Sequence, residues 1–183
     1  MKQACYNYLS GLDASNDFSS PDGLWFSLTT GILRVQTDDN AFTDVTNCML
    51  LAAVPGTVGD GGAAKAVTGT NAAGVTRTVN TFVGAAPGAA KLRRFLVGPK
   101  DCEVTGIAES PDGKALFVNI QHPGEESFGT ANLFNVTAAD TAPAAVILAD
   151  PTRYTSHWPD GGAARPRAAT IVITKNDGGL IGI

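Results

Sequence analysis

The 183-residue sequence lacks several features that identify common classes of protein. No segment approaches the roughly eighteen consecutive apolar residues of a transmembrane helix, so no membrane span is predicted. The stretch from Met1 to Phe18 has no charged region followed by an apolar core, and it is therefore not a signal peptide. The protein is expected either to be cytosolic or to lack its natural amino terminus. The sequence contains neither a Walker pattern nor a GxGxxG motif between a predicted strand and a helix, which argues against a nucleotide site.

Charged residues are also scarce, and they leave a net charge of −4. The only dense basic run is Lys91, Arg93 and Arg94 with Lys100 nearby, and a solvated outer strand explains it best. Because phosphate backbones are bound by clustered Lys and Arg, a general nucleic-acid binder is not expected.

Cysteine is rare as well, with Cys5, Cys48 and Cys102 alone. Their spacing fits no metal-ligand motif, and an odd thiol remains after any pairing. Cys48 lies in an apolar run and is interpreted as a buried small hydrophobic residue. Cys102 adjoins Glu103 at the mouth of a predicted hairpin, yet burial is the commoner role for cysteine.

Short β-branched and aromatic runs separated by Gly, Pro, Asn and Asp predict an all-β protein with marginal helix. We expect strands near 24–28, 32–37, 48–54, 91–97, 103–109, 115–120, 144–148 and 168–174. Between them, residues 55–88 are rich in Gly, Ala, Thr and Val and contain almost no aromatics, so a long surface loop or partly disordered insertion is expected. A shorter loop of the same kind is expected from Glu126 to Ala145.

The stretch from Cys102 to Glu125 contains two apolar strands joined by a Pro-Asp-Gly turn. A tight hairpin brings its two ends to one edge of a sheet, so Glu103, His122 and Glu125 should emerge together. Pro21 to Asn40 repeats this pattern: Asp22 precedes the turn Thr30-Gly31, and Asp38 and Asp39 follow its second strand. Two copies of one unit suggest blades of a β-propeller with long insertions.

A third segment, Ser156 to Gly179, leads from a turn-rich loop through Arg167 into the strand near 168–174. If this strand is the inner strand of a blade, Arg167 joins the acids on one rim. If it is an outer strand, Arg167 is more remote, and the sequence leaves both arrangements open.

A rim of this composition suits a metal and phosphate site, since carboxylates from separate blades hold hard cations and arginine binds phosphate. Each residue also has a purely structural explanation. Aspartate is favoured in Pro-Asp-Gly turns, which accounts for Asp112 and also fits Asp22. His122 precedes a proline and could cap a strand. Glu103 is the strongest candidate, because an acid that opens an apolar strand carries a desolvation cost that a cation would offset.

The ordered motifs SPDGLWF…QTDDN, RRFLVGP…CEVTGIAESPDGKALFVNIQHPGE and HWPDGG…RPRAATIVITKNDGGLIG resemble the carboxy-terminal part of the PhoX-type alkaline phosphatases. The resemblance begins near Leu12 and leaves the Gly/Ala-rich insertion unaccounted for. It implies part of a six-bladed β-propeller from bacteria, with a calcium and iron cluster, that hydrolyses phosphomonoesters at alkaline pH. It also implies a periplasmic or secreted location after twin-arginine export. Glu103 and Asp22 are then metal ligands, and Arg167 and His122 contact phosphate or support the rim.

PhoX-type enzymes are several times longer, so residues 1–183 are expected to form a single incomplete propeller domain with blade-like units at about 12–100 and 101–183. Two blades cannot close a propeller, and their open edges invite self-association. The leading hypothesis is the carboxy-terminal portion of a metal-dependent phosphatase that is inactive alone. The alternative is a non-catalytic propeller-like binding or assembly module.

Overall fold

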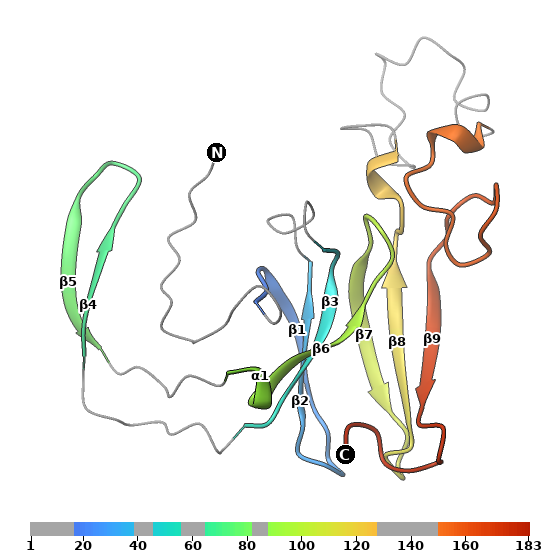
Figure 1. The fold of residues 1–183 in the computed structure, drawn as a ribbon, viewed down its shortest axis with the longest axis horizontal. Coiled ribbons are helices and arrows are strands. Elements are labelled where there is room, and N and C mark those ends of the chain that lie inside the picture. Colours follow the sequence, from blue (N-terminus) through green and yellow to red (C-terminus); the bar gives the residue numbers. More distant parts are fainter. Residues whose placement is uncertain (1–16, 39–45, 56–64, 82–87, 128–149) are drawn as a thin grey trace.

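The computed structural model describes residues 17–38, 46–55, 65–81, 88–127 and 150–183. Within these ranges the protein is all-β, as the sequence predicts, with three antiparallel sheets (Figure 1). Helix in the described residues is limited to one α-helical turn, α1 (Gly88–Lys91), and two 3-10 turns, η2 (Glu125–Ser127) and η3 (Pro151–Arg153). The predicted strand near 144–148 and most of the loop from Glu126 to Ala145 lie outside the described residues.

Two of the sheets are meanders whose neighbouring strands are joined antiparallel. The first sheet contains β1 (Pro21–Phe26), β2 (Leu33–Thr37), β3 (Met49–Ala53) and β6 (Leu92–Val97), in that order. The second contains β7 (Glu103–Glu109), β8 (Ala115–Gln121) and β9 (Ala169–Thr174). These seven strands match the predicted ones within a few residues. Their arrangement as blades of a propeller stays a prediction.

The third sheet differs from the sequence-based expectation for residues 55–88. Instead of an irregular loop throughout, the described part forms an exposed hairpin of β4 (Lys65–Thr70) and β5 (Thr76–Thr81). β-Branched residues explain the difference, because Thr68 pairs with Thr78 and their hydroxyl groups lie 2.7 Å apart. Large apolar groups are scarce in this segment, so local strand preference and not burial accounts for the hairpin.

The core lies in the seam between the two meanders. Alternation along β3 directs Leu50 into this seam, whereas Met49 and Leu51 belong to a second cluster with Val35 and Leu92. The buried members of the seam cluster come from both sheets and from the carboxy-terminal segment: Cys48, Leu50, Cys102, Val104, Leu116, Val118, Ile120 and Ile181. Burial of this apolar surface fixes the two sheets face to face.

A buried cation also lies at the seam. Arg34 of β2 is only 1% exposed, and its guanidinium lies 4.2 Å from the centre of the Phe95 ring. Nη2 of Arg34 donates a hydrogen bond to the carbonyl of Ile181 at 3.3 Å, and the backbone N–H of Ile181 donates to Gly113 at 3.0 Å. Burial lowers the pKa of Arg34, and the negative charge of Glu109 opposes this effect. The carboxy-terminal segment thereby connects β2 to the turn between β7 and β8.

The two Leu→Ala substitutions Leu116→Ala and Leu28→Ala test the importance of the seam. Leu116 is 1% exposed and Leu28 is 93% exposed. We expect Leu116→Ala to lower the free energy of unfolding by about 2–5 kcal/mol, because it leaves a cavity in the core. The same truncation at Leu28 should change it by less than about 0.5 kcal/mol. Urea denaturation followed by circular dichroism measures both, and similar losses would contradict a core centred on the seam.

Candidate functional site

The two meanders bring acidic side chains to the same end of the molecule. In the first sheet, Pro21 pairs with Thr37, and a bulge between Pro21 and Gly23 contains Asp22. Asp38 follows β2 directly, with its backbone N–H bonded to Ser20. In the second sheet, Glu103 opens β7 opposite Gln121 at the end of β8. The strand ends therefore place Asp22, Asp38 and Glu103 in one region, which we call the acidic end.

Electrostatics show that these carboxylates influence one another. The Glu103 side chain is 12% exposed, and burial is the largest cause that raises its pKa. The negative charge of Asp38 is the next largest, and Asp22 adds a smaller contribution in the same direction. His122 opposes the rise. Burial and like charge both make the ionised form of Glu103 costly.

His122 lies between two glutamates at this end. Its Nε2 is 3.3 Å from Oε2 of Glu103, and its Nδ1 is 3.1 Å from Oε2 of Glu125. The contact to Glu125 lacks hydrogen-bond geometry, so Nδ1 has no hydrogen-bond partner among the described residues. The sequence places these three residues at one edge, and the structure confirms that they meet. The imidazole is thus held by carboxylates on both sides.

The loops behind His122 are tightly tied to each other. The N–H groups of Gly124 and Glu125 donate to the carbonyls of Lys100 and Asp101 at 2.9 and 3.3 Å. The Thr155 hydroxyl donates to the Asp101 carboxylate. Backbone φ is positive at Asp101 (53°), His122 (34°) and Gly124 (75°), a conformation that costs energy for the first two residues. Strain of this kind is typical of functional sites, where the surrounding contacts maintain it.

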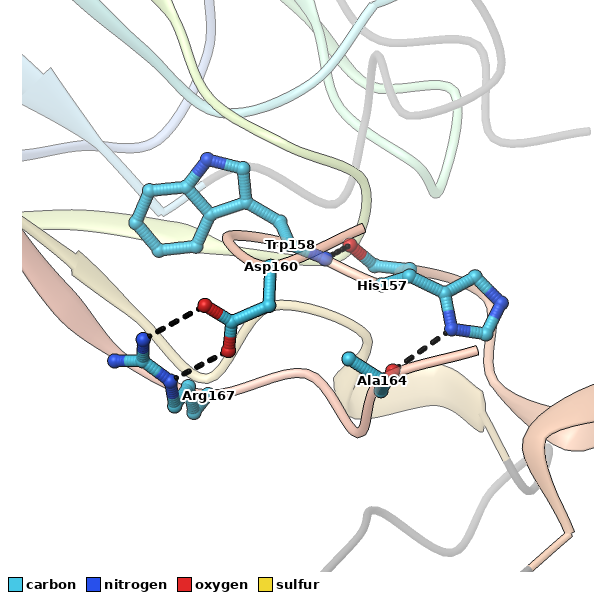
Figure 2. A network of polar contacts seen from close by, with 6 residues as sticks. His157, Trp158, Asp160, Ala164 and Arg167 are labelled. Atoms are coloured by element: carbon cyan, nitrogen blue, oxygen red, sulfur yellow. Dashed lines mark hydrogen bonds and ion pairs between the residues drawn. The ribbon is translucent and has the colours of Figure 1, made fainter. Parts of the chain in front are cut away.

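The structure places Arg167 away from Glu103. Arg167 precedes β9, and β8 separates β9 from β7, so the strands of Arg167 and Glu103 are the two edge strands of this sheet. Its guanidinium forms a two-pronged ion pair with Asp160, with Nε and Nη2 at 2.9 and 3.0 Å from the carboxylate oxygens (Figure 2). Both side chains are more than half exposed. Arg167 is thus two strands away from Glu103, and whether β9 is an inner or an outer blade strand stays a prediction.

The same loop contains His157 and Trp158, and its contacts are mainly structural. Nδ1 of His157 lies 2.8 Å from the Ala164 carbonyl (Figure 2). The backbone N–H of Arg167 donates to the carbonyl of Trp158 at 3.1 Å. Trp158 packs against the core of the seam. These bonds close the loop on itself, and they do not direct His157 to the acidic end.

Comparison with known proteins now adds to this geometry. The family model of alkaline phosphatase PhoX matches residues 2–124. The chain belongs to the PhoX family of alkaline phosphatases. The PhoX match includes Asp22, Glu103 and His122, whereas Arg167 lies beyond it. No curated protein and no solved structure shows a significant match.

The acidic end contains some of the donor groups that a metal ion would need. The donor type fits, because carboxylate oxygens bind hard cations. The set is incomplete, since no group of three His, Cys, Asp or Glu side chains among the described residues could hold an ion. The structure thus provides some donors of the right chemistry without a full coordination sphere.

Sequence reasoning selected only part of the group at the acidic end. Asp38 follows β2 and Glu125 lies beyond β8, so both are acids at strand ends. They were not candidate site residues, although His122 also lies just beyond β8. Asp112, which was interpreted as a turn residue, accepts hydrogen bonds from Ser110 Oγ at 2.7 Å and from the Lys114 N–H at 3.2 Å. That interpretation is confirmed.

Glu103→Gln should reveal the raised pKa through the pH dependence of stability. When the folded-state pKa lies above the unfolded one, the stabilising effect of the bound proton is complete below the unfolded pKa and is lost as pH rises through the folded pKa. In metal-free buffer, we therefore expect the variant to gain stability relative to the original protein between about pH 4 and pH 7. Urea denaturation at each pH measures the difference.

Asp112→Asn is the control with the opposite sign. Hydrogen bonds from Ser110 and the Lys114 N–H lower the pKa of Asp112, so its contribution to stability is present above the unfolded-state pKa and lost as pH falls. As pH rises toward the unfolded-state pKa of about 4, this variant should lose stability relative to the original protein, and above about pH 4 the difference should stay constant. A Glu103→Gln difference that is constant with pH would contradict the proposed electrostatic coupling.

Gly124→Ala tests whether the loop packing at the acidic end matters beyond backbone strain. A Cβ at Gly124 would lie 3.0 Å from Pro166 and 3.2 Å from Ser127, whereas at Gly161, with nearly the same φ of 71°, it would meet nothing within 4 Å. We expect Gly161→Ala to cost about 1–2 kcal/mol from strain alone. Gly124→Ala should cost at least about 1 kcal/mol more. Equal losses in urea denaturation would argue against close packing there.

Proposed function

We propose that this PhoX-family chain contributes the carboxylates of a metal-dependent site that hydrolyses phosphomonoesters. The observation that supports this best is the grouping of Asp22, Asp38 and Glu103 at the ends of neighbouring sheets, with Glu103 nearly buried. Burying a carboxylate beside others of like charge is unfavourable unless a cation compensates for it. Glu103 and Asp22 are the proposed metal ligands.

Calcium and iron are the metals proposed for this site. Calcium binds oxygen donors almost exclusively, and iron in proteins also accepts carboxylates. Such ions, when bound, neutralise charge that develops on a phosphoryl group. The remaining ligands would come from groups beyond those described, because the described residues do not complete a site.

His122 is proposed to hold or transfer a proton beside the substrate. Its ring is fixed between Glu103 and Glu125, so its orientation relative to the carboxylates is restricted. Imidazole changes its protonation near neutral pH, which makes it the usual side chain for this role. Its position next to a proposed ligand would also serve to orient that ligand.

Arg167 is the weaker candidate for phosphate contact. Its planar guanidinium suits a phosphate, but Nε and Nη2 are both bonded to the Asp160 carboxylate (Figure 2). Binding phosphate would require exchange of that carboxylate for the substrate. Arg167 and Asp160 are both exposed, so replacing the Asp160 carboxylate by a phosphate at this surface would cost little.

The alternative function is a non-catalytic binding or assembly module. It is favoured by the incomplete ligand set and by the sheet edges at β1 and β9, which no other strand of the described residues pairs with. Unpaired strand edges offer backbone groups to a further strand, so self-association belongs to this alternative. No helix of the described residues is long and apolar enough to cross a membrane. A periplasmic or secreted location remains part of the phosphatase proposal.

Calcium binding and phosphatase activity can be measured on the same preparation. We expect isothermal titration calorimetry to detect Ca²⁺ binding, and Glu103→Gln to weaken it at least about tenfold, since loss of even an outer-shell partner costs 10- to 100-fold. Asp112→Asn, an exposed turn acid, should bind normally. A chromogenic phosphomonoester assayed with Ca²⁺ and iron should be hydrolysed very slowly or not at all by the chain alone.

The outcomes separate the two functions. Calcium binding that depends on Glu103 supports the proposed site even where turnover is absent. Binding unaffected by Glu103→Gln, or no binding at all, would favour the assembly module. Measurable hydrolysis lost in Glu103→Gln would show that the chain is active by itself.

A further inference from the structure

Two cysteines face each other across the seam. Cys48 directly precedes β3 of the first sheet, and Cys102 directly precedes β7 of the second. Both are 4% exposed, both belong to the same core cluster, and both are thiols in the structure. Neither the proposed metal site nor the proposed proton transfer uses them.

Gly98 brings the two residues together. Its backbone N–H donates to the Cys48 carbonyl at 2.9 Å, which extends the pairing of Met49 with Val97 by one residue. Sγ of Cys102 lies 2.3 Å from the point where a Cβ on Gly98 would stand, and the Cys48 carbonyl oxygen lies 3.3 Å from the same point. The absent side chain of Gly98 therefore leaves the space in which the Cys102 thiol lies beside Cys48.

This geometry puts the Cys102 sulfur near the Cys48 side chain. Residues directly opposite in an antiparallel pair have Cβ atoms roughly 4.5–5.5 Å apart, so Cβ of Cys48 lies about that far from the Cβ point of Gly98, and Cys102 Sγ lies 2.3 Å from the same point. A disulfide spans Cβ atoms roughly 3.5–4.5 Å apart, so the bond requires the Cys102 side chain to rotate toward Cys48 and the strands to shift slightly.

We infer that Cys48 and Cys102 form a disulfide bond when the protein folds under oxidising conditions. This inference goes beyond the proposed function and does not depend on it. One thiolate attacks a small disulfide oxidant such as oxidised glutathione, forming a mixed disulfide and releasing one glutathione thiol. The second cysteine then displaces the other glutathione and closes the Cys48–Cys102 bond. Two electrons pass to the oxidant, and two reduced glutathione molecules are produced.

Burial determines when this reaction takes place. In the folded protein both thiols are enclosed, so a dissolved oxidant cannot reach them. The bond therefore forms before the seam closes, and afterwards the same burial protects it from reductants. It closes a loop of roughly 50 residues, which is long enough to restrict the unfolded chain considerably. It also fixes the start of β7, where Glu103 follows Cys102, to the first sheet.

A non-reducing tryptic digest of the full chain identifies the bond directly. Each cysteine falls in its own peptide: Cys5 in 3–34, Cys48 in 35–65 and Cys102 in 101–114. After folding in a buffer of oxidised and reduced glutathione, followed by alkylation in denaturant, we expect one linked pair, 35–65 with 101–114, and one alkylated thiol on Cys5. Linked peptides that contain Cys5, or three alkylated thiols, would overturn the inference.

Thermal unfolding provides the second readout. Oxidation should raise the midpoint by several degrees over the reduced protein, as the constraint of a loop of this length implies. Because each variant is compared with its own reduced form, any cost of the substitution cancels. The rise should vanish in Cys48→Ala and in Cys102→Ala and persist in Cys5→Ala. A rise that depends on Cys5 would contradict the assignment.

Discussion

The apolar seam between the two meanders is the contact on which the rest of the molecule depends. Its side chains come from strands distant in sequence, such as Leu50 of β3 and Val118 of β8. Because each sheet is apolar on this face, neither can bury it without the other. Once they pack, the register of each hairpin fixes where its strands begin and end. The positions of Asp22 and Glu103 are consequences of that packing.

The acidic end and the seam affect the stability of the fold in opposite directions. Apolar burial in the seam is favourable throughout, whereas the group around Glu103 gathers like charges and strained backbone at His122 and Asp101. The loops that carry this strain are bonded to each other through Gly124, Lys100 and Thr155, so the cost is distributed over a rigid frame. The proposed cation would offset the like charges at this end.

Sequence patterns predicted most of the fold because its strands follow local rules. Alternation and turn residues located the hairpins around Gly31 and Gly113 and brought Glu103, His122 and Glu125 to one edge. They did not predict that β9 pairs with β8 and not with β7. The two-strand separation of Arg167 from Glu103 therefore emerged only from the structure. The contribution of Asp38 depends on packing between sheets, which no local pattern contains. The β4–β5 hairpin was missed because its threonines stabilise strands without forming a core.

That hairpin enters the chain between β3 and β6, two strands that pair directly. Ala53 pairs with Leu92, and the Val54 N–H donates to the Lys91 carbonyl at 2.9 Å, so the ends of the inserted segment are joined by the sheet itself. The entropy of closing a loop rises only slowly with its length once its ends are fixed. Evolution can therefore lengthen, shorten or replace this segment with little effect on the sheet, which makes it the natural entry point for new sequence in this protein.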